Sequence, residues 1–300
     1  MESILCFDIG GTRVKYGLFQ DRVLTESGSF PTDRSQGLHV LQSMKDLVSR
    51  YEPDALSVSS PGFADNSDGI IHSGNVIEGF NGLNLRSWAR EECNLPLALE
   101  NDANCAALAE YAMGAGQGSK ALAVITLGTG VGGGLVLDGK LWAGNHRMAG
   151  EFGFLFIHGI HTDRPEDEIL SGHASTRALC EVCQEPDGKK IFEKAAAGDA
   201  RMQQALDHFL DSLAMAVYNI AYTVAPDTVL IGGAVSAQES LIPEVKKRVS
   251  ALTPSFSVDL TDIMTIDSCR FGNEAGLYGA LANWMLHRPE SPSPRLSPEI

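Results

Sequence analysis

Apolar and polar residues alternate in short runs near the start of the chain, and a similar pattern returns near its middle. Residues 4–9 predict a buried strand, and Val14, Tyr16 and Leu18 alternate along a second strand. Residues 121–127 and 131–137 predict another such pair, again joined by a glycine turn. We therefore expect a repeated unit of strand, glycine turn and strand, once in each half of the chain.

Stretches with helical spacing of apolar residues lie between and after these strands. Helices are predicted at residues 38–51, 88–93, 104–113, 175–182, 200–225, 240–252 and 274–286, and further strands at 55–59, 97–99, 228–231 and 265–266. The alternation of strands and helices in both halves indicates two α/β domains. We place them at residues 1–117 and 118–286, with a glycine hinge at 114–118, the final helix able to pack on the first domain, and a disordered, proline-rich tail at 287–300.

The charge balance narrows the range of partners. The 300 residues include 23 Lys and Arg against 38 Asp and Glu, a formal net charge of −15. That balance disfavours nucleic acids and anionic membranes as partners, because binding to phosphate backbones depends on clustered cations. The six cysteines are scattered and are expected to be free thiols of a cytoplasmic protein. Neither a secretion leader nor an apolar run of roughly 18 residues is expected.

The segment around Asp8 is the first that can carry chemistry. A predicted strand delivers this carboxylate to its carboxyl end, and Gly10 and Gly11 then let backbone N–H groups approach a ligand closely. Thr12 adds a hydroxyl group and Arg13 a positive charge. An aspartate beside a phosphate-binding turn can hold Mg²⁺ directly or through water. The alternative is an ordinary hairpin turn.

The second glycine run has five glycines in the seven residues 128–134. Such a run packs little side chain and is best explained by the close approach of a ligand or of another segment. No Gly-Lys-Ser/Thr follows it and no helix follows it, so it is neither a P-loop nor a dinucleotide fingerprint. Two such hairpins could hold the phosphates of a nucleotide; the second contributes Thr129, Gly130, Gly132, Gly133 and Gly134.

Three other positions are weaker candidates. Asp102 follows a predicted strand and is either the cap of the next helix or a general base at a strand's carboxyl end. Glu151 is an acid in a small, apolar setting, with a surface turn as its alternative. Gly232 and Gly233 end a predicted strand and could flank a nucleotide's base or ribose.

Two pairs of residues of metal-ligating type are interpreted as structural. We expect Cys180 and Cys183 to be helix residues, and His158 and His161 to be loop residues, rather than metal ligands.

Together these segments resemble the ROK family of sugar kinases and sugar-sensing repressors, which have the actin-like ATPase fold of two α/β lobes. The motifs are Asp8-Ile9-Gly10-Gly11-Thr12, Ser60-Pro61-Gly62, Asn75, Glu100-Asn101-Asp102, residues 127–134, Ala149-Gly150-Glu151-Phe152-Gly153 and Ile231-Gly232-Gly233. The resemblance covers roughly residues 4–285. It implies that Asp102 is the catalytic base and that Gly62, Asn75, Asn101 and Glu151 lie at the sugar. It also implies a homodimer.

The chain departs from the family's pattern in one place. Most members have a histidine after the Glu-x-Gly and then a zinc-binding cysteine cluster, but here Phe154 takes the histidine's place and residues 159–171 contain no cysteine. We therefore expect no structural zinc, as in β-glucoside kinases and some N-acetylmannosamine kinases. Either Glu168 or Ser171 takes the place of a second glutamate that contacts the sugar in other members.

We thus expect an ATP- and Mg²⁺-dependent kinase that acts on a hydroxyl group, the 6-hydroxyl, of a hexose or hexose derivative. A sugar-responsive regulator of the same family would carry a DNA-binding segment, for which the position of Asp8 leaves no room. A non-catalytic sugar-binding module would tolerate loss of Asp102. An actin-like ATPase or chaperone gives no reason for Asn101, Asp102 and Glu151 to occur together.

Overall fold

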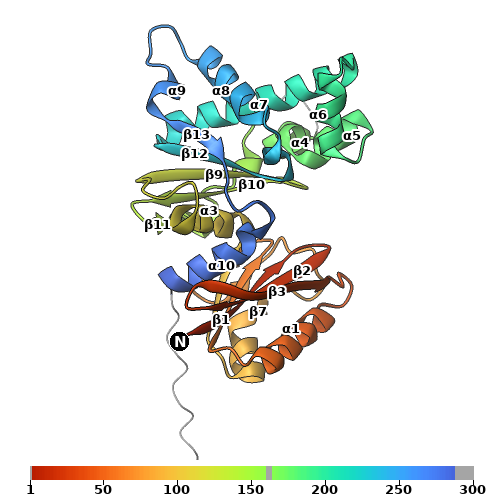
Figure 1. The fold of residues 1–300 in the computed structure, drawn as a ribbon, viewed down its shortest axis with the longest axis vertical. Helices are drawn as coiled ribbons and strands as arrows, with labels where there is room; N and C mark the ends of the chain where they lie inside the picture. The colour runs from red at the N-terminus through yellow and green to blue at the C-terminus, as the bar shows by residue number, and fades with distance from the viewer. Residues whose placement is uncertain (1, 160–163, 288–300) are drawn as a thin grey trace, which may run out of the picture. The chain divides into compact units, whose positions relative to one another are not determined.

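The computed structural model describes residues 2–159 and 164–287. It divides into two compact units, one formed by the residues up to Cys105 together with those from Glu274 on, and the other by Ala106–Asn273. The boundary between them falls inside a helix, α3 (Asp102–Met113), and not at the glycines of 114–118. The predicted tail at 287–300 lies outside the described residues except for His287. Figure 1 labels the elements.

The first unit is built on a five-stranded sheet of order β3-β2-β1-β4-β8. Its strands are β1 (Ser3–Ile9), β2 (Arg13–Gln20), β3 (Val23–Pro31), β4 (Ala55–Ser60) and β8 (Leu97–Asn101). The first three form the expected antiparallel meander, and β4 and β8 run parallel to β1. The central strands are buried on both faces. Most of β1 is therefore apolar, but β4 also buries the small polar residues Ser57, Ser59 and Ser60.

The two faces of this sheet differ in the size of their side chains. Large residues such as Leu5, Phe7 and Val58 pack with the apolar stripe of α1 (Gly37–Tyr51). The alternate positions of the same strands hold small residues such as Cys6 and Ser57, and helix α10 (Ala275–Leu286) packs against β1, β4 and β8. Small residues let this helix approach closely, and the Ser57 hydroxyl donates a buried hydrogen bond of 2.6 Å to the carbonyl of Ala280.

Short elements complete the first unit. A three-stranded sheet of β5 (Ala64–Asp65), β6 (Ile70–Ile71) and β7 (Leu83–Asn84) is followed by α2 (Leu85–Trp88) and a π-helical turn at Ala89–Cys93. The short helix predicted at 88–93 therefore exists but starts earlier and changes its winding. The small sheet has only two residues in each strand, too few to give an alternation that could be recognised.

The second unit repeats the plan of the first. Its sheet has the order β11-β10-β9-β12-β13, with β9–β11 antiparallel and β12 and β13 parallel to β9. The strands are β9 (Ala121–Leu127), β10 (Val131–Leu137), β11 (Lys140–Leu141), β12 (Thr228–Gly233) and β13 (Thr265–Ser268). The matching strand orders confirm the internal repeat predicted from the glycine turns.

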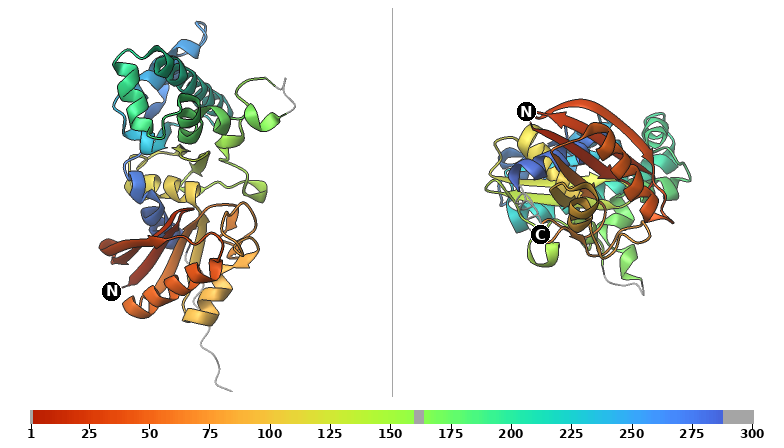
Figure 2. Two further views of the ribbon diagram at one scale, coloured as in Figure 1. Left: turned by 90° about the vertical axis from the view of Figure 1, so that its right-hand side faces the viewer. Right: turned by 90° about the horizontal axis from the view of Figure 1, so that it is seen from below.

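Helices α4–α8 gather on one face of this second sheet (Figures 1 and 2). The helices between α3 and α10 are α4 (Leu170–Ala174), α5 (Thr176–Cys183), α6 (Gly188–Ala196), α7 (Ala200–Val224), α8 (Leu241–Leu252) and the short α9 (Leu260–Ile263). Short 3₁₀ turns lie at Asn145–Arg147, Phe152–Phe154, Pro165–Asp167, Ala234–Ala237 and Gly272–Glu274. The long helix α7 is the expected core helix, with Leu213 and Val217 fully buried.

Two predictions about local structure have clear outcomes. All six cysteines are free, and Cys180 and Cys183 lie on α5 as predicted. The sequence missed α6, whose Asp187 caps the first turn by accepting a hydrogen bond from the Lys189 backbone N–H. Within the described residues, the search for a helix long and apolar enough to cross a bilayer found none.

Gly279 on α10 tests the close packing of this helix. A Cβ atom there would lie 2.0 Å from the carbonyl oxygen of Cys105, which is backbone and cannot move aside cheaply. We expect Gly279→Ala to lower the free energy of unfolding by about 1–3 kcal/mol, the usual cost of overpacking. Gly188→Ala is the matched control, since its nearest neighbours are methyl groups of side chains at 3.3 and 3.4 Å. Equal urea midpoints for the two variants would contradict the close packing of α10.

Candidate active site

The carboxyl ends of three parallel strands meet at one edge of the first sheet. In the register of β1, β4 and β8, Asp8 pairs with Ser59, Ser59 pairs with Glu100, and Ser60 pairs with Asn101. Adjacent strands are about 4.8 Å apart, so this edge brings residues from three distant parts of the sequence within roughly 10 Å. Open α/β sheets bind ligands at such an edge.

Asp8 is held in place by two neighbours. One carboxylate oxygen accepts a hydrogen bond from the Lys15 ammonium group at 3.2 Å, and the other accepts one from the Ser59 hydroxyl at 3.1 Å. Gly276, at the start of α10, approaches so closely that a Cβ atom would lie 2.3 Å from this carboxylate. The roles of Ser59 and Gly276 in positioning Asp8 could not be predicted, because the three residues are far apart along the chain.

The turn after Asp8 is tight. The Gly10 N–H donates a hydrogen bond of 3.0 Å to the Arg13 carbonyl, and the Thr32 hydroxyl donates one of 2.7 Å to the Gly10 carbonyl. The Arg13 guanidinium donates to the Ser29 hydroxyl on β3. The cation at the turn itself is Arg34, which donates from Nε to the Gly11 carbonyl and which the sequence did not suggest.

Three of the four expected sugar-binding residues lie together beyond this edge. The Asn101 side-chain amide donates a hydrogen bond of 2.9 Å to the Gly62 carbonyl. Asn75 donates from Nδ2 to the Ser60 hydroxyl and to the Pro61 carbonyl, both at 3.0 Å. Gly62 has a φ of +91° and Ser73 lies against it, so no other residue type fits easily.

Asp102 is exposed at the first residue of α3. Its predicted alternative role was the helix cap, but Asn101 fills most of that role: its Oδ1 accepts from the backbone N–H groups of Ala103 at 2.9 Å and Asn104 at 3.1 Å. Asp102 itself accepts only from Ala103 among these, at 2.9 Å. The buried Glu100 orients this turn by accepting hydrogen bonds from Asn101 and Asn104.

In the second unit, the glycine turn of β9 and β10 is supported from α5. Gly128 donates a hydrogen bond of 2.9 Å to the Gly130 carbonyl. Arg177 donates from Nε to the Thr129 carbonyl at 2.9 Å, and the Val131 N–H donates to the Ser171 hydroxyl at 3.0 Å. Arg177 and Ser171 were not predicted to support this turn. Ser171 is thus engaged by the hairpin.

Some of the glycines are explained by contacts within the chain. A Cβ atom on Gly133 would lie 2.5 Å from the Gly150 carbonyl oxygen, and one on Gly233, where φ is +102°, would lie 2.0 Å from the Leu127 carbonyl oxygen. At Gly128 and Gly130 the nearest atoms would be 3.9 and 3.6 Å away, which is ordinary van der Waals contact, so no crowding within the chain requires glycine at these two positions. The tip of the hairpin, rather than Gly133, is therefore where a ligand can approach.

Glu151 is half-buried at the start of a 3₁₀ turn. Burial removes water from the carboxylate and raises its pKa above the ordinary value of 4.5. Glu168 lies beside the segment that follows this turn: its backbone carbonyl accepts a hydrogen bond from the Ile157 N–H, and its charge acts on His173. His161 lies outside the described residues.

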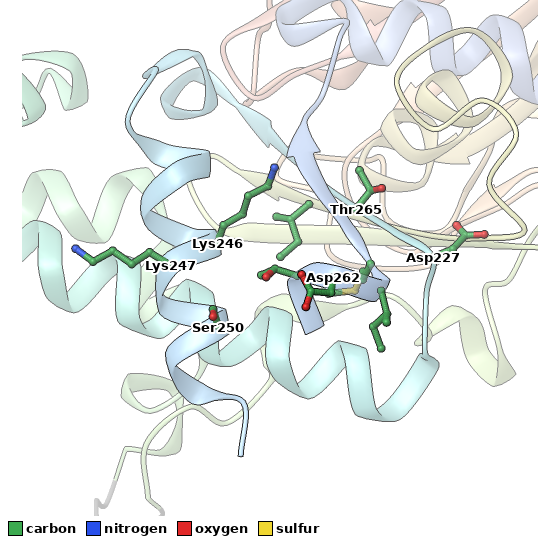
Figure 3. Close-up of a pocket in the computed structure, with 10 residues that line it drawn as sticks. Asp227, Lys246, Lys247, Ser250, Asp262 and Thr265 are labelled. Carbon is green, nitrogen blue, oxygen red and sulfur yellow. The ribbon is translucent and has the colours of Figure 1, made fainter. Parts of the chain in front are cut away.

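A hollow of about 580 Å³ opens on the second unit between α8, α9 and β13 (Figure 3). It is lined by Lys246, Lys247, Asp227, Asp262 and their neighbours. None of the residues predicted from the sequence for sugar or nucleotide binding lines it. It is therefore not part of the candidate site.

The architecture of the two units defines an actin-like ATPase fold. The chain belongs to the ROK family, whose model matches residues 4–287. It is 33% identical over 295 residues to a β-glucoside kinase of Listeria monocytogenes, and the match covers 94% of this chain and 97% of that protein.

Solved structures agree. The Lmo2764 protein of Listeria monocytogenes, a proposed N-acetylmannosamine kinase, has a TM-score of 0.87 at 30% identity, covering 96% of this chain and 100% of that one. A ROK family protein of Streptococcus pneumoniae, solved with sucrose, has a TM-score of 0.84 at 28% identity, covering 95% and 98%. Full-length similarity to named kinases makes the chain a phosphotransferase of that class.

The raised pKa of Glu151 gives a prediction about stability. The folded state favours the protonated acid, so ionisation of Glu151 lowers the free energy of unfolding as pH rises through and above 4.5. We expect Glu151→Gln to raise the urea midpoint at pH 7 in the absence of ligands, with the advantage disappearing below pH 4.5. Glu239→Gln, at an exposed position, is the control. An advantage of equal size at pH 4 and pH 7 would show that desolvation is not its cause.

Proposed function

We propose that the protein transfers the γ-phosphoryl group of ATP to the 6-hydroxyl of a hexose derivative, and that a β-glucoside is its preferred acceptor, with glucose and N-acetylmannosamine as the other candidates. The coarser part, an ATP-dependent sugar kinase, rests on family membership and on relatives that match the whole chain. The observation that carries the proposal is the carboxyl edge of the first sheet, where Asp8 on β1 and Asn101 on β8 lie on either side of β4 and Asp102 directly follows Asn101.

The choice of a glucoside is supported by two relatives. The Listeria β-glucoside kinase shares 33% of its residues with this chain, and the Streptococcus structure contains sucrose, which is a disaccharide. The first name gives a glucoside as the acceptor, and the second protein binds a sugar larger than a single hexose. Gly62, Asn75, Asn101 and Glu151 are the proposed sugar-binding residues. The orientation of three of them by main-chain contacts supports this, because a pre-organised polar group loses little entropy when it binds a hydroxyl.

Asp102 is the proposed general base. It accepts the proton of the attacking hydroxyl as the sugar oxygen attacks the γ-phosphorus atom. Its exposure at the start of α3 supports this role, since a base must reach the acceptor's proton. Asn101 makes the cap contacts of α3, so the fold does not depend on Asp102 for that task.

Each unit contributes proposed nucleotide-binding residues. In the first, they are the residues of the turn after β1, namely Asp8, Gly10, Gly11, Thr12 and Arg13. In the second, they are Thr129, Gly130, Gly132, Gly133, Gly134, Gly232 and Gly233. Gly130 is the best supported of these, because a Cβ atom there would make only an ordinary contact within the chain, whereas Gly133 and Gly233 have reasons within the fold to be glycine.

Mg²⁺ is the proposed metal cofactor, and Asp8 the residue that would hold it. The carboxylate is an oxygen donor of the kind Mg²⁺ prefers, and Mg²⁺ usually keeps several waters when one carboxylate binds it. Lys15 and Ser59 fix the direction of this carboxylate. When bound, Mg²⁺ supplies positive charge that offsets the charge on the phosphates.

The remaining expectations stay proposals. We propose a cytoplasmic homodimer without a cysteine-type zinc site. We also propose that Glu168, rather than Ser171, takes the place of the second glutamate near the sugar, because Ser171 already serves the hairpin. A non-catalytic sugar-sensing regulator is the alternative function. Such a protein would bind the sugar without releasing ADP.

Asp102→Asn tests the proposed base. We expect kcat to fall by about 10²-fold or more, because the amide cannot accept the proton, while the affinity for ATP stays nearly unchanged. Asp138→Asn, at an exposed hairpin turn where φ is +48°, is the control because asparagine also adopts this conformation. A variant that keeps more than about a tenth of the wild-type kcat would refute the assignment.

A panel of acceptors tests the substrate. ADP release is followed with cellobiose, glucose, N-acetylmannosamine and N-acetylglucosamine, each with ATP and Mg²⁺. We expect the highest kcat/KM with the glucoside, by about tenfold or more over glucose, since a second sugar ring adds contact area. Equal or higher kcat/KM with glucose overturns the glucoside assignment. Failure of every sugar to release ADP, with sugar binding intact, favours the regulator.

A further inference from the structure

Three histidines from separate parts of the second unit lie together. They are His158 in the segment after the 3₁₀ turn at Phe152–Phe154, His173 on α4 and His208 on α7. Each offers one ring nitrogen, and these atoms all lie within 4.8 Å of one another. The ring centroids are 4.4 to 5.2 Å apart.

His173 is the best fixed of the three. Its Nδ1 lies 2.9 Å from Nε2 of His208, and its own Nε2 is buried without a hydrogen-bond partner. The His173 ring is half-buried, whereas His208 lies at the surface, so the cluster is reachable from solvent.

The surrounding charges favour a cation. The carboxylate of Glu168 acts on His173 and that of Asp211 acts on His208, and both raise the respective pKa values. Burial and the neighbouring imidazoles outweigh these carboxylates and lower the pKa of both rings below the ordinary value of 6.5. Neutral imidazole is the form that binds metal ions.

We propose that His158, His173 and His208 bind one divalent transition-metal ion of the Zn²⁺ type, with solvent in the remaining coordination position. Zn–N bonds of about 2.0–2.1 Å in a tetrahedral site put two ligand nitrogens about 3.4 Å apart. One pair of nitrogens in the cluster is 2.9 Å apart and no pair of ligand atoms is more than 4.8 Å apart, so small movements of side chains bring all three nitrogens to one ion. Three imidazoles are a ligand set that suits Zn²⁺.

The three histidines differ from the zinc-binding cysteine cluster of other family members. The missing cysteines between residues 159 and 171 argue against one kind of zinc site but do not bear on three histidines. A bound ion would join the segment at His158, helix α4 and helix α7. Since Ser171 on α4 accepts the Val131 N–H, the ion would also stiffen the support of the β9–β10 turn.

The test measures metal binding directly. The full chain is stripped with a chelator and titrated calorimetrically with Zn²⁺, and with Co²⁺ while its visible absorption is recorded. We expect one ion per chain and a Co²⁺ spectrum of a nitrogen-rich, low-coordinate site. His208→Gln removes an exposed ligand with little risk to folding and should weaken binding by at least about tenfold. His39→Gln, an exposed histidine on α1, should bind as the wild type does.

A thermal scan separates a built site from adventitious binding. Zn²⁺ should raise the unfolding temperature of the wild type and of His39→Gln but not that of His208→Gln or His173→Gln. Absence of stoichiometric binding, or equal binding by His208→Gln and the wild type, overturns the proposal. Because the readout is binding, it does not depend on whether the sugar-kinase assignment is correct.

Discussion

The parallel register of β1, β4 and β8 is the constraint on which the candidate site depends. It sets Asp8, Ser59 and Glu100 side by side and carries Asn101 to the end of its strand. The close approach of α10 keeps that register, because Ser57 bonds to its backbone and Gly276 leaves room for the Asp8 carboxylate. A bulkier residue at either place would move the edge at which the polar groups meet.

The two units use the same device at their glycine turns. In the first, Arg34 donates to the Gly11 carbonyl; in the second, Arg177 donates to the Thr129 carbonyl. A guanidinium bound to a turn carbonyl fixes the backbone and places positive charge beside its N–H groups. The two units therefore share an arginine at the glycine turn as well as the strand order. Positive charge at both turns suits a polyphosphate better than a neutral ligand.

The elements predicted correctly are those marked by local sequence patterns. The features that the sequence did not predict depend on contacts between residues far apart along the chain. The meanders, α1, α7 and α10 were predictable because alternation and helical spacing mark them. Gly62, Asn75 and Asn101 came only from the family resemblance, and their hydrogen bonds join segments far apart in sequence. For Gly133 and Gly233 the sequence suggested only a nucleotide as the reason for glycine. The carbonyl groups of Gly150 and Leu127 that crowd these two positions are brought there by tertiary packing, which the sequence pattern does not reveal.

The return of α10 to the first sheet has a consequence for biosynthesis. The residues from Ala106 to Asn273 form one uninterrupted stretch and can acquire their structure while the ribosome is still translating. The sheet that begins at Ser3 has to wait for Ala275–Leu286 before one of its faces is covered. Until then that face is exposed to chaperones and proteases, so the part of the chain made first is the part completed last.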